Sequence, residues 1–174
     1  MKITILILSL MLALLGCDLR GDTGQSTSDV RDETKGAAPE FDLVRIAGGT
    51  MKSTDIKSKV AVIDLWATWC VPCILEIPNF NKLHEAYDGK GVQTIAITVK
   101  SGALDEIKPN VAKLDMKYPV LVGDDKVVEA FGGVIGFPTT YVVTKEWRIY
   151  KKYLGMLPNK RELIEKDIEK LLTQ

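Results

Sequence analysis

The chain has 174 residues, of which 46% are hydrophobic, and its 23 basic and 23 acidic residues leave no formal net charge. This length allows one domain with a sizeable core and a short appendage. The balanced charge and the lack of a basic stripe give no reason to expect nucleic acid as a partner.

The chain begins with an apolar segment. Residues 3–15 are apolar apart from Thr4 and Ser9, and this run is too short for a membrane-spanning helix, which needs about 20 residues. It fits the hydrophobic region of a secretory signal. The run ends in Leu14-Leu15-Gly16-Cys17, which resembles the lipobox of bacterial lipoproteins. The resemblance implies a signal peptide over residues 1–16 and a lipid on Cys17, with an ordinary cleaved signal or an uncleaved anchor as the alternatives.

Residues 17–38 are rich in small, polar and charged side chains. Such a segment buries too little apolar surface to order itself, so we expect a flexible tether between the lipid and a folded domain over residues 39–174. The protein is then expected in the bacterial cell envelope, facing the periplasm or extracytoplasmic space. Its lipid anchor would lie in the outer face of the inner membrane, or in the outer membrane.

Short apolar runs and helical stretches alternate from residue 41 onward. Residues 41–45 alternate like a strand, and Gly48-Gly49 follow as a turn signal. Residues 60–65 are almost continuously apolar, which predicts a central strand covered on both faces. Residues 72–88 are predicted to form a helix that Pro78 kinks. The side chains expected on its buried face are Leu75, Phe80, Leu83 and Tyr87.

The alternation continues to the end of the chain. Strands separated by helices predict an α/β fold with helices on both faces of a central sheet. The last helix, residues 160–172, is amphipathic, with Leu163, Ile164, Ile168, Leu171 and Leu172 on its apolar side. The other strands are expected at residues 92–99, 118–122, 139–144 and 147–154, and the other helices at 104–114 and 125–131.

A pair of cysteines follows the central strand, in the run Trp66-Ala67-Thr68-Trp69-Cys70-Val71-Pro72-Cys73. A cysteine in the first turn of a helix meets unpaired backbone N–H groups and the positive end of the helix dipole. Both favour the thiolate, so the sulfur becomes nucleophilic at neutral pH. The second cysteine, one turn further on, can close a disulfide with the first. The pair can therefore hold or release two electrons by thiol–disulfide exchange.

Other uses of this cysteine pair are less well supported. A zinc site needs about four ligands, usually from a second cysteine pair or two histidines; the chain has only Cys17 and His84 besides. We therefore expect no metal. Haem attachment needs a histidine directly after the second cysteine, where Ile74 stands. A purely structural disulfide stays possible, but closing so short a loop gains little chain entropy.

Three segments together resemble a known family. The run from Asp64 to Cys73, the helix proline Pro78 and the run Gly136-Phe137-Pro138-Thr139-Thr140 resemble the thioredoxin fold, and within it the TlpA/ResA-like membrane-anchored thiol-disulfide oxidoreductases. The resemblance covers about residues 39–174. It implies a central mixed sheet with helices on both faces, an added N-terminal hairpin and a βα insertion in the middle of the fold.

The resemblance also assigns roles to residues around the cysteine pair. Cys70 resembles the nucleophile, with the more exposed sulfur, and Cys73 resembles the resolving cysteine. Pro138 resembles the cis-proline that faces the dithiol, which would turn the Phe137 backbone toward an extended substrate segment. The residues expected to contact substrate are Trp69, Val71, Pro72, Phe137 and Pro138.

Two carboxylates are candidates for proton transfer. The ResA group has an active-site glutamate where Glu76 stands, one helical turn after Cys73; the alternative is a solvated helix glutamate. Ordinary thioredoxins have a buried aspartate where Asp64 stands, whereas TlpA/ResA relatives usually have asparagine. Burial would raise the pKa of Asp64 and make it a general base for Cys73. The alternative for Asp64 is a solvent-exposed position at the strand edge.

The predicted function is therefore reduction of disulfides in exported proteins, with apocytochrome c as a candidate substrate. The resemblance implies a membrane electron donor of the DsbD/CcdA type. We expect no cofactor, because the two sulfurs carry the electrons. One alternative is a thiol-dependent peroxidase, although peroxiredoxins have threonine where Ala67 stands. The other is a lipid-tethered peptide-binding module without catalysis.

Overall fold

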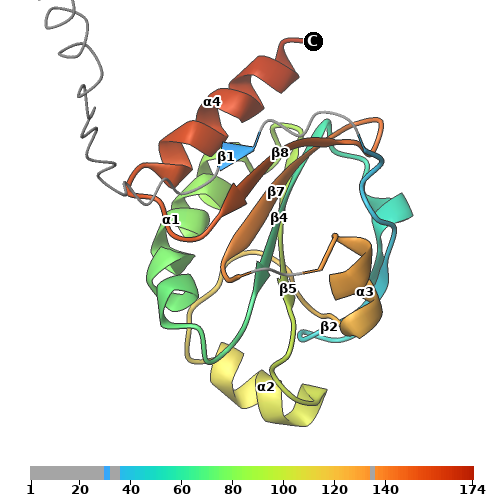
Figure 1. The fold of residues 1–174 in the computed structure, drawn as a ribbon, viewed down its shortest axis with the longest axis vertical. Helices are drawn as coiled ribbons and strands as arrows, with labels where there is room; N and C mark the ends of the chain where they lie inside the picture. Colours follow the sequence, from blue (N-terminus) through green and yellow to red (C-terminus); the bar gives the residue numbers. More distant parts are fainter. Residues whose placement is uncertain (1–29, 32–35, 134–135) are drawn as a thin grey trace, which may run out of the picture.

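The computed structural model describes residues 30–31, 36–133 and 136–174. Their strands form one eight-stranded mixed sheet in the order β1-β8-β7-β4-β5-β6-β2-β3, with helices on both of its faces (Figure 1). The strands are β1 (Val30–Arg31), β2 (Asp42–Arg45), β3 (Thr50–Lys52), β4 (Val60–Trp66), β5 (Val92–Thr98), β6 (Val120–Val122), β7 (Thr139–Thr144) and β8 (Ile149–Leu154). The helices are η1 (Ser53–Asp55), α1 (Val71–Tyr87), α2 (Leu104–Val111), α3 (Asp125–Ala130) and α4 (Lys160–Leu172).

The strand β4 lies at the centre of the sheet, as its apolar run predicts. All of its residues are buried. It pairs in parallel with β5 and antiparallel with β7, so each neighbour satisfies one edge of its backbone. Strands buried on both faces are almost continuously hydrophobic, and Asp64 is the one acidic residue in this strand.

Side chains of β4 alternate between two cores, one on each face of the sheet. Val60, Val62 and Trp66 pack toward α1, α2 and α4. Ala61, Ile63 and Leu65 pack toward α3 and the β2–β3 hairpin. By this alternation Asp64 faces α1 and α4. The predicted α/β architecture with helices on both faces is confirmed.

The two additions to the thioredoxin fold are also present. The strands β2 and β3 form the N-terminal hairpin. The helix α2 and the strand β6 form the central insertion, and β6 lies between β5 and β2 in the sheet. The insertion thereby joins the hairpin to the rest of the sheet.

The prediction that Leu75 lies on the buried face of α1 is wrong. Leu75 is 62% exposed, and the buried face of the helix consists of Cys73, Glu76, Ile77, Phe80 and Leu83. These positions recur at the helical spacing of three and four residues, whereas Leu75 lies two residues from Cys73 and points away. Tyr87 is half-buried. The other predicted elements are all present, with ends that differ by a few residues.

Part of the segment expected to be a tether lies on the sheet. Val30–Arg31 pair with β8, Ala37 forms a bridge with Arg148, and Ala38 is buried. The free edge of β8 offers unpaired backbone groups to which even a polar segment can bind. The ordered domain therefore includes residues before position 39. The expected signal peptide and Cys17 lie outside the described residues, and no described helix is long and apolar enough to cross a membrane.

Candidate active site

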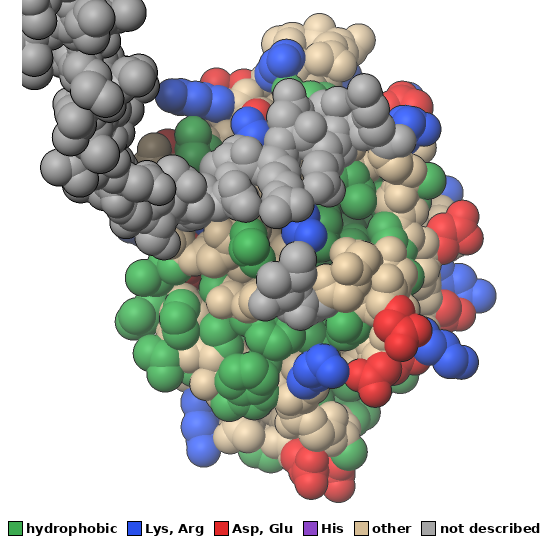
Figure 2. All heavy atoms as spheres, viewed as in Figure 1, with side chains coloured by type: hydrophobic (Ala, Val, Ile, Leu, Met, Phe, Trp, Pro, Cys, Tyr) green, Lys and Arg blue, Asp and Glu red, His purple; other side chains and the backbone are tan. Residues whose placement is uncertain are grey.

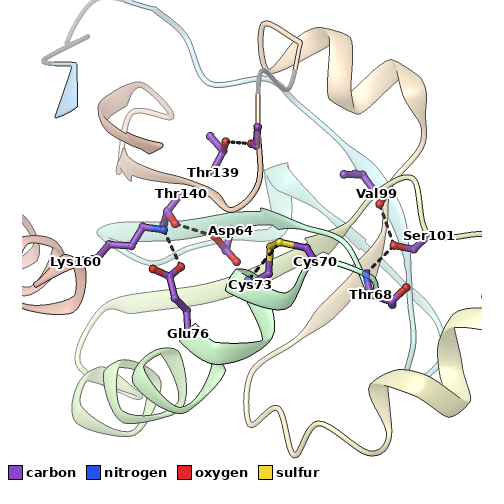
Figure 3. The surroundings of a disulfide bond; sticks show 11 residues. Asp64, Thr68, Cys70, Cys73, Glu76, Val99, Ser101, Thr139, Thr140 and Lys160 are labelled. Atoms are coloured by element: carbon purple, nitrogen blue, oxygen red, sulfur yellow. Dashed lines mark hydrogen bonds and ion pairs between the residues drawn. A yellow bond between two sulfur atoms is a disulfide. The ribbon is translucent and has the colours of Figure 1, made fainter. Parts of the chain in front are cut away.

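The cysteine pair lies where β4 gives way to α1. Cys70 is the N-cap of the helix, and its sulfur accepts a hydrogen bond of 3.3 Å from the backbone N–H of Cys73. The two residues form a disulfide, with their Cα atoms 5.3 Å apart (Figure 3). Pro72 stands at the start of the helix, where its missing N–H costs nothing. The predicted helix-start position of Cys70 is thus confirmed, and with it the N–H donor that would stabilise a thiolate.

Cys70 is the more exposed of the two cysteines only by a small margin in this oxidised state. Cys70 is 5% exposed, hardly more than Cys73 at 3%. Both cysteines belong to the core cluster that contains Trp66 and Ala67. However, Trp69 and Val71, the chain neighbours of Cys70, are 61% and 64% exposed. The disulfide therefore lies just beneath the surface, between exposed side chains.

A loop after β5 holds the segment that leads into the cysteines. The hydroxyl of Ser101 accepts the Thr68 backbone N–H at 3.0 Å and donates to the Val99 carbonyl. The indole N–H of Trp69 donates to the Lys100 carbonyl at 2.8 Å. Lys100 has a positive φ of 50°, a conformation that turns the chain sharply here. This loop fixes Trp69 even though its ring is mostly exposed.

The Phe137–Pro138 peptide bond is cis, as the resemblance implies. Leu65 pairs with Thr139 in the sheet, so Pro138 lies beside the end of β4, close to where the cysteine segment begins. The ring of Phe137 packs edge-on against that of Trp69, with 5.7 Å between centroids. Two of the residues predicted to contact substrate, Trp69 and Phe137, thus meet from distant segments of the chain.

Asp64 is buried beneath the disulfide, and its carboxylate lies beside it in Figure 3. Its partner is Thr140, which is opposite Asp64 in the sheet and donates its hydroxyl to Oδ1 at 2.7 Å. Burial raises the pKa of Asp64 to about 7, while Lys160 and the hydrogen bond from Thr140 lower it in part. The predicted burial and direction of the pKa shift are confirmed. A carboxyl with this pKa can accept and release a proton near neutral pH.

Glu76 is also buried, so it is not a solvated helix glutamate. Its Oε2 lies 2.8 Å from the Nζ of Lys160, and the two side chains are only 6% and 4% exposed. Glu76 also accepts a backbone hydrogen bond from Leu157. Burial raises the pKa of Glu76, and Lys160 opposes that shift. The site therefore holds two buried carboxylates and one buried ammonium.

Two residues of this group were not predicted from the sequence. Lys160 lies one helical turn before Ile164, on the buried face of α4. This spacing could have indicated from the sequence that Lys160 is buried. Thr140 belongs to a motif that the sequence did show. Its contact with Asp64 depends on the register between β4 and β7, which the sequence does not display.

Exposed apolar side chains surround the cysteine pair. Trp69, Val71 and Leu75 lie on the exposed side of the first turns of α1 and just before it, and each is more than 60% exposed. Figure 2 shows hydrophobic side chains gathered over the start of this helix. Such a patch beside a reactive group is typical of a surface that binds another protein. In the described part of the chain, no group of three or more His, Cys, Asp or Glu could hold a metal.

The fold and this site define a thiol-disulfide oxidoreductase of the thioredoxin fold. A family model described as the AhpC/TSA family matches residues 34–152, more than half of the chain, and the chain belongs to this family.

Individual proteins similar to this chain are also thiol-disulfide oxidoreductases or thioredoxin-like proteins by name. Thiol-disulfide oxidoreductase ResA of Bacillus thuringiensis is 28% identical over 174 residues, covering 98% of this chain and 99% of the relative. Thioredoxin-like protein YneN of Bacillus subtilis is 30% identical over 130 residues, covering 74% of this chain and 75% of the relative. Among solved structures, a thiol:disulfide interchange protein of Chlorobium tepidum superposes with a TM-score of 0.69. It is 25% identical and covers 83% of this chain and 99% of its own.

Proposed function

We propose that this protein reduces disulfide bonds of exported proteins from a lipid-anchored position in the bacterial cell envelope. The observation that carries the redox part is the Cys70–Cys73 disulfide at the start of α1, beside the buried Asp64. The predicted N-terminal signal and the lipobox-like sequence that ends at Cys17 support the location. The exposed apolar patch around the cysteines supports another protein, rather than a small molecule, as the oxidised substrate.

The first step is attack by the reduced form. The Cys70 thiolate, stabilised by the Cys73 backbone N–H and the helix dipole, attacks one sulfur of a substrate disulfide. The substrate S–S bond breaks, and a mixed disulfide forms between Cys70 and the substrate. The second substrate sulfur leaves as a thiolate and takes up a proton.

The second step is resolution by Cys73. Its thiol loses a proton to a buried carboxylate, for which Asp64 and Glu76 are the candidates. The Cys73 thiolate then attacks the Cys70 sulfur, the mixed disulfide breaks, and the substrate leaves fully reduced. Two electrons have passed to the substrate, and the protein is left with the disulfide seen in the structure. A membrane electron donor of the DsbD/CcdA type would then restore the dithiol.

Trapping tests this proposal in cells. The full-length Cys73→Ala variant should hold its partner through Cys70 as a mixed disulfide that survives purification without reductant. The control is Cys70→Ser/Cys73→Ala, which cannot form that bond. We expect exported proteins with cysteine pairs, including apocytochromes c with a CxxCH motif, only with the first variant. Capture of no disulfide-linked protein, or of the same proteins with both variants, would count against the proposal.

The anchor is tested separately by fractionation. The wild-type protein should sediment with membranes and incorporate labelled fatty acid, whereas Cys17→Ser should do neither. A wild-type protein without label, or a Cys17→Ser variant that still carries it, would overturn the lipid anchor and leave the redox function standing.

Two other functions give different results. A thiol-dependent peroxidase would consume hydrogen peroxide faster than it reduces insulin disulfides; the buried Ala67 has no hydroxyl to offer a peroxide. A binding module without catalysis would keep its function in cells as Cys70→Ser. We expect insulin reduction to exceed peroxide consumption, and Cys70→Ser to lose cellular function.

A further inference from the structure

An ion pair with almost no access to solvent links the helix of the cysteines to the last helix. Lys160 and Glu76 are 84 residues apart in sequence, yet Nζ and Oε2 lie within 2.8 Å in a buried contact. Figure 3 shows the ion pair beside Asp64 and Thr140, on the side of Asp64 away from the disulfide. The buried polar groups drawn around the disulfide thus include one cation, the Lys160 ammonium.

Stability alone gives a weak reason for a lysine at this position. Removing an ammonium from water costs several kcal/mol, and a well-packed apolar pair is often as stable as a buried ion pair. Lys160 also begins α4, where the positive end of the helix dipole disfavours a cation. These two energetic costs indicate that the positive charge of Lys160 serves a purpose other than stability.

The charge acts on both candidate proton acceptors. Lys160 contacts Glu76 directly and lowers the pKa of Asp64 through space, whereas Glu76 raises it. Tyr118 faces both carboxylates from the segment before β6, and its burial raises its pKa, so it remains neutral. Among the other charged residues of α4, Arg161 borders the same cavity as the ion pair, and Asp167 binds Tyr153 and Lys151.

A small cavity borders the ion pair between α1 and α4. Its volume is about 10 Å³, close to the roughly 10–15 Å³ that one water molecule needs by this measure. Glu76 and Lys160 lie in its wall, together with Asn79 and Arg161. A water here would have polar partners and could carry a proton from Glu76 toward solvent.

We propose that Lys160 is a positioning residue that keeps one negative charge on the Asp64–Glu76 pair, so that an acceptor is free when Cys73 must lose its proton. This inference rests on the proposed function and adds the residue that controls its second step. With the ammonium present, one carboxylate stays ionised at neutral pH, and the proton from Cys73 enters the pair. The proton leaves through Glu76 and the cavity once the Cys73 sulfur has bonded to Cys70. Without the ammonium, no cation would stabilise the ionised form of either buried carboxylate, and both would stay protonated to higher pH.

The two steps can be followed separately with 5,5′-dithiobis(2-nitrobenzoate). Attack by Cys70 releases one thionitrobenzoate, and resolution by Cys73 releases the second. The rate of the second release, measured from pH 5 to 10, gives the pH profile of resolution. The variants are Lys160→Met, which keeps the aliphatic stem, and Lys160→Arg, which keeps the charge. Lys166→Met, on the exposed face of the same helix, is the matched control.

We expect Lys160→Met to move the midpoint of the second phase upward by about 1–3 pH units, the size of a charge-partner effect. At pH 7 the second release should then slow by roughly tenfold or more, while the first release and the rate at high pH are retained. Lys160→Arg and Lys166→Met should follow the wild type. An unchanged profile for Lys160→Met, or an equal loss of rate at every pH, would overturn the proposal.

A second variant keeps the test decisive if Lys160→Met does not fold. Glu76→Gln/Lys160→Met removes both charges of the ion pair. The midpoint of its second phase should lie above that of the wild type, but by less than the rise expected for Lys160→Met alone. A midpoint at or below the wild-type value would contradict the role of Lys160. Failure of the proposed function is distinct: the wild type would then react with the reagent in two phases but reduce no protein disulfide.

Discussion

The two faces of the sheet hold cores of different composition. On the α3 face the described buried side chains are apolar apart from small hydroxyls such as Ser53 and Thr139. On the α1–α4 face lie all four buried charged side chains of the described residues: Asp64, Glu76, Lys160 and Asp167. The same strand, β4, supplies Ile63 to the first core and Asp64 to the second. One face therefore stabilises the fold, and the other also performs the chemistry.

The largest expected difference is between replacing Cys70 and replacing Ile63, which lie on opposite faces of the sheet. Cys70→Ser should abolish insulin reduction, because it removes the proposed nucleophile and leaves Cys73, buried in the first turn of α1, without a partner cysteine. Ile63→Ala, in the α3-side core, should cost about 2–5 kcal/mol of unfolding free energy and leave the turnover of the folded protein within about twofold of the wild type. Urea unfolding and insulin turbidity measure the two effects. A catalytic loss in Ile63→Ala beyond its folded fraction would erase the distinction between the faces.

Next in size is the cost of breaking the buried ion pair. Glu76→Ala leaves the Lys160 ammonium buried without its carboxylate and should destabilise the protein by about 3–5 kcal/mol. The matched control is Asp42→Ala, which breaks an exposed pair with Lys52 and should cost less than about 1 kcal/mol. Urea unfolding at pH 7 compares them, and equal losses would contradict a buried, charge-dependent site.

A pH-dependent effect of similar size is expected at Asp64. Its pKa is raised from 3.8 to about 7 in the folded protein. The contribution of protonated Asp64 to the free energy of unfolding is therefore fully present below pH 3.8, and it is lost as the pH rises to about 7. Asn cannot ionise, so Asp64→Asn should gain at most about 4 kcal/mol relative to the wild type above pH 7. It should gain less than about 1 kcal/mol from this source at pH 4. Urea unfolding of the oxidised proteins at pH 4 and pH 8 checks this, and a difference that does not change with pH would contradict the assignment.

The smallest effect compares two neighbouring threonines on opposite faces. Thr140→Val removes the hydrogen bond to Asp64 and should cost about 1 kcal/mol. Because that bond lowers the pKa of Asp64, its loss should also raise the midpoint of the pH–stability curve. Thr139→Val loses only the bond to the Gly136 carbonyl and should leave the midpoint in place. A shift of equal size in both variants would show that the effect is not local to Asp64.

How far the sequence predicted the site depends on how local each feature is. The start of α1, the place of Cys70 at that start and the central strand were all predicted, because the apolar run, Pro72 and the cysteine spacing lie within a few residues of one another. The exposure of Leu75 and the cover over Cys70 were not, since both depend on which face the rest of the molecule covers.

The sequence by itself determined the chemistry: two sulfurs one helical turn apart, after a buried strand that carries one acidic residue. Only the tertiary structure decided which groups surround them. Thr140 reaches Asp64 through strand register, and Lys160 reaches Glu76 from a helix 84 residues further along the chain. Local spacing fixes a helix start, but the charge state of a buried group depends on neighbours that only long-range packing brings within a few ångströms.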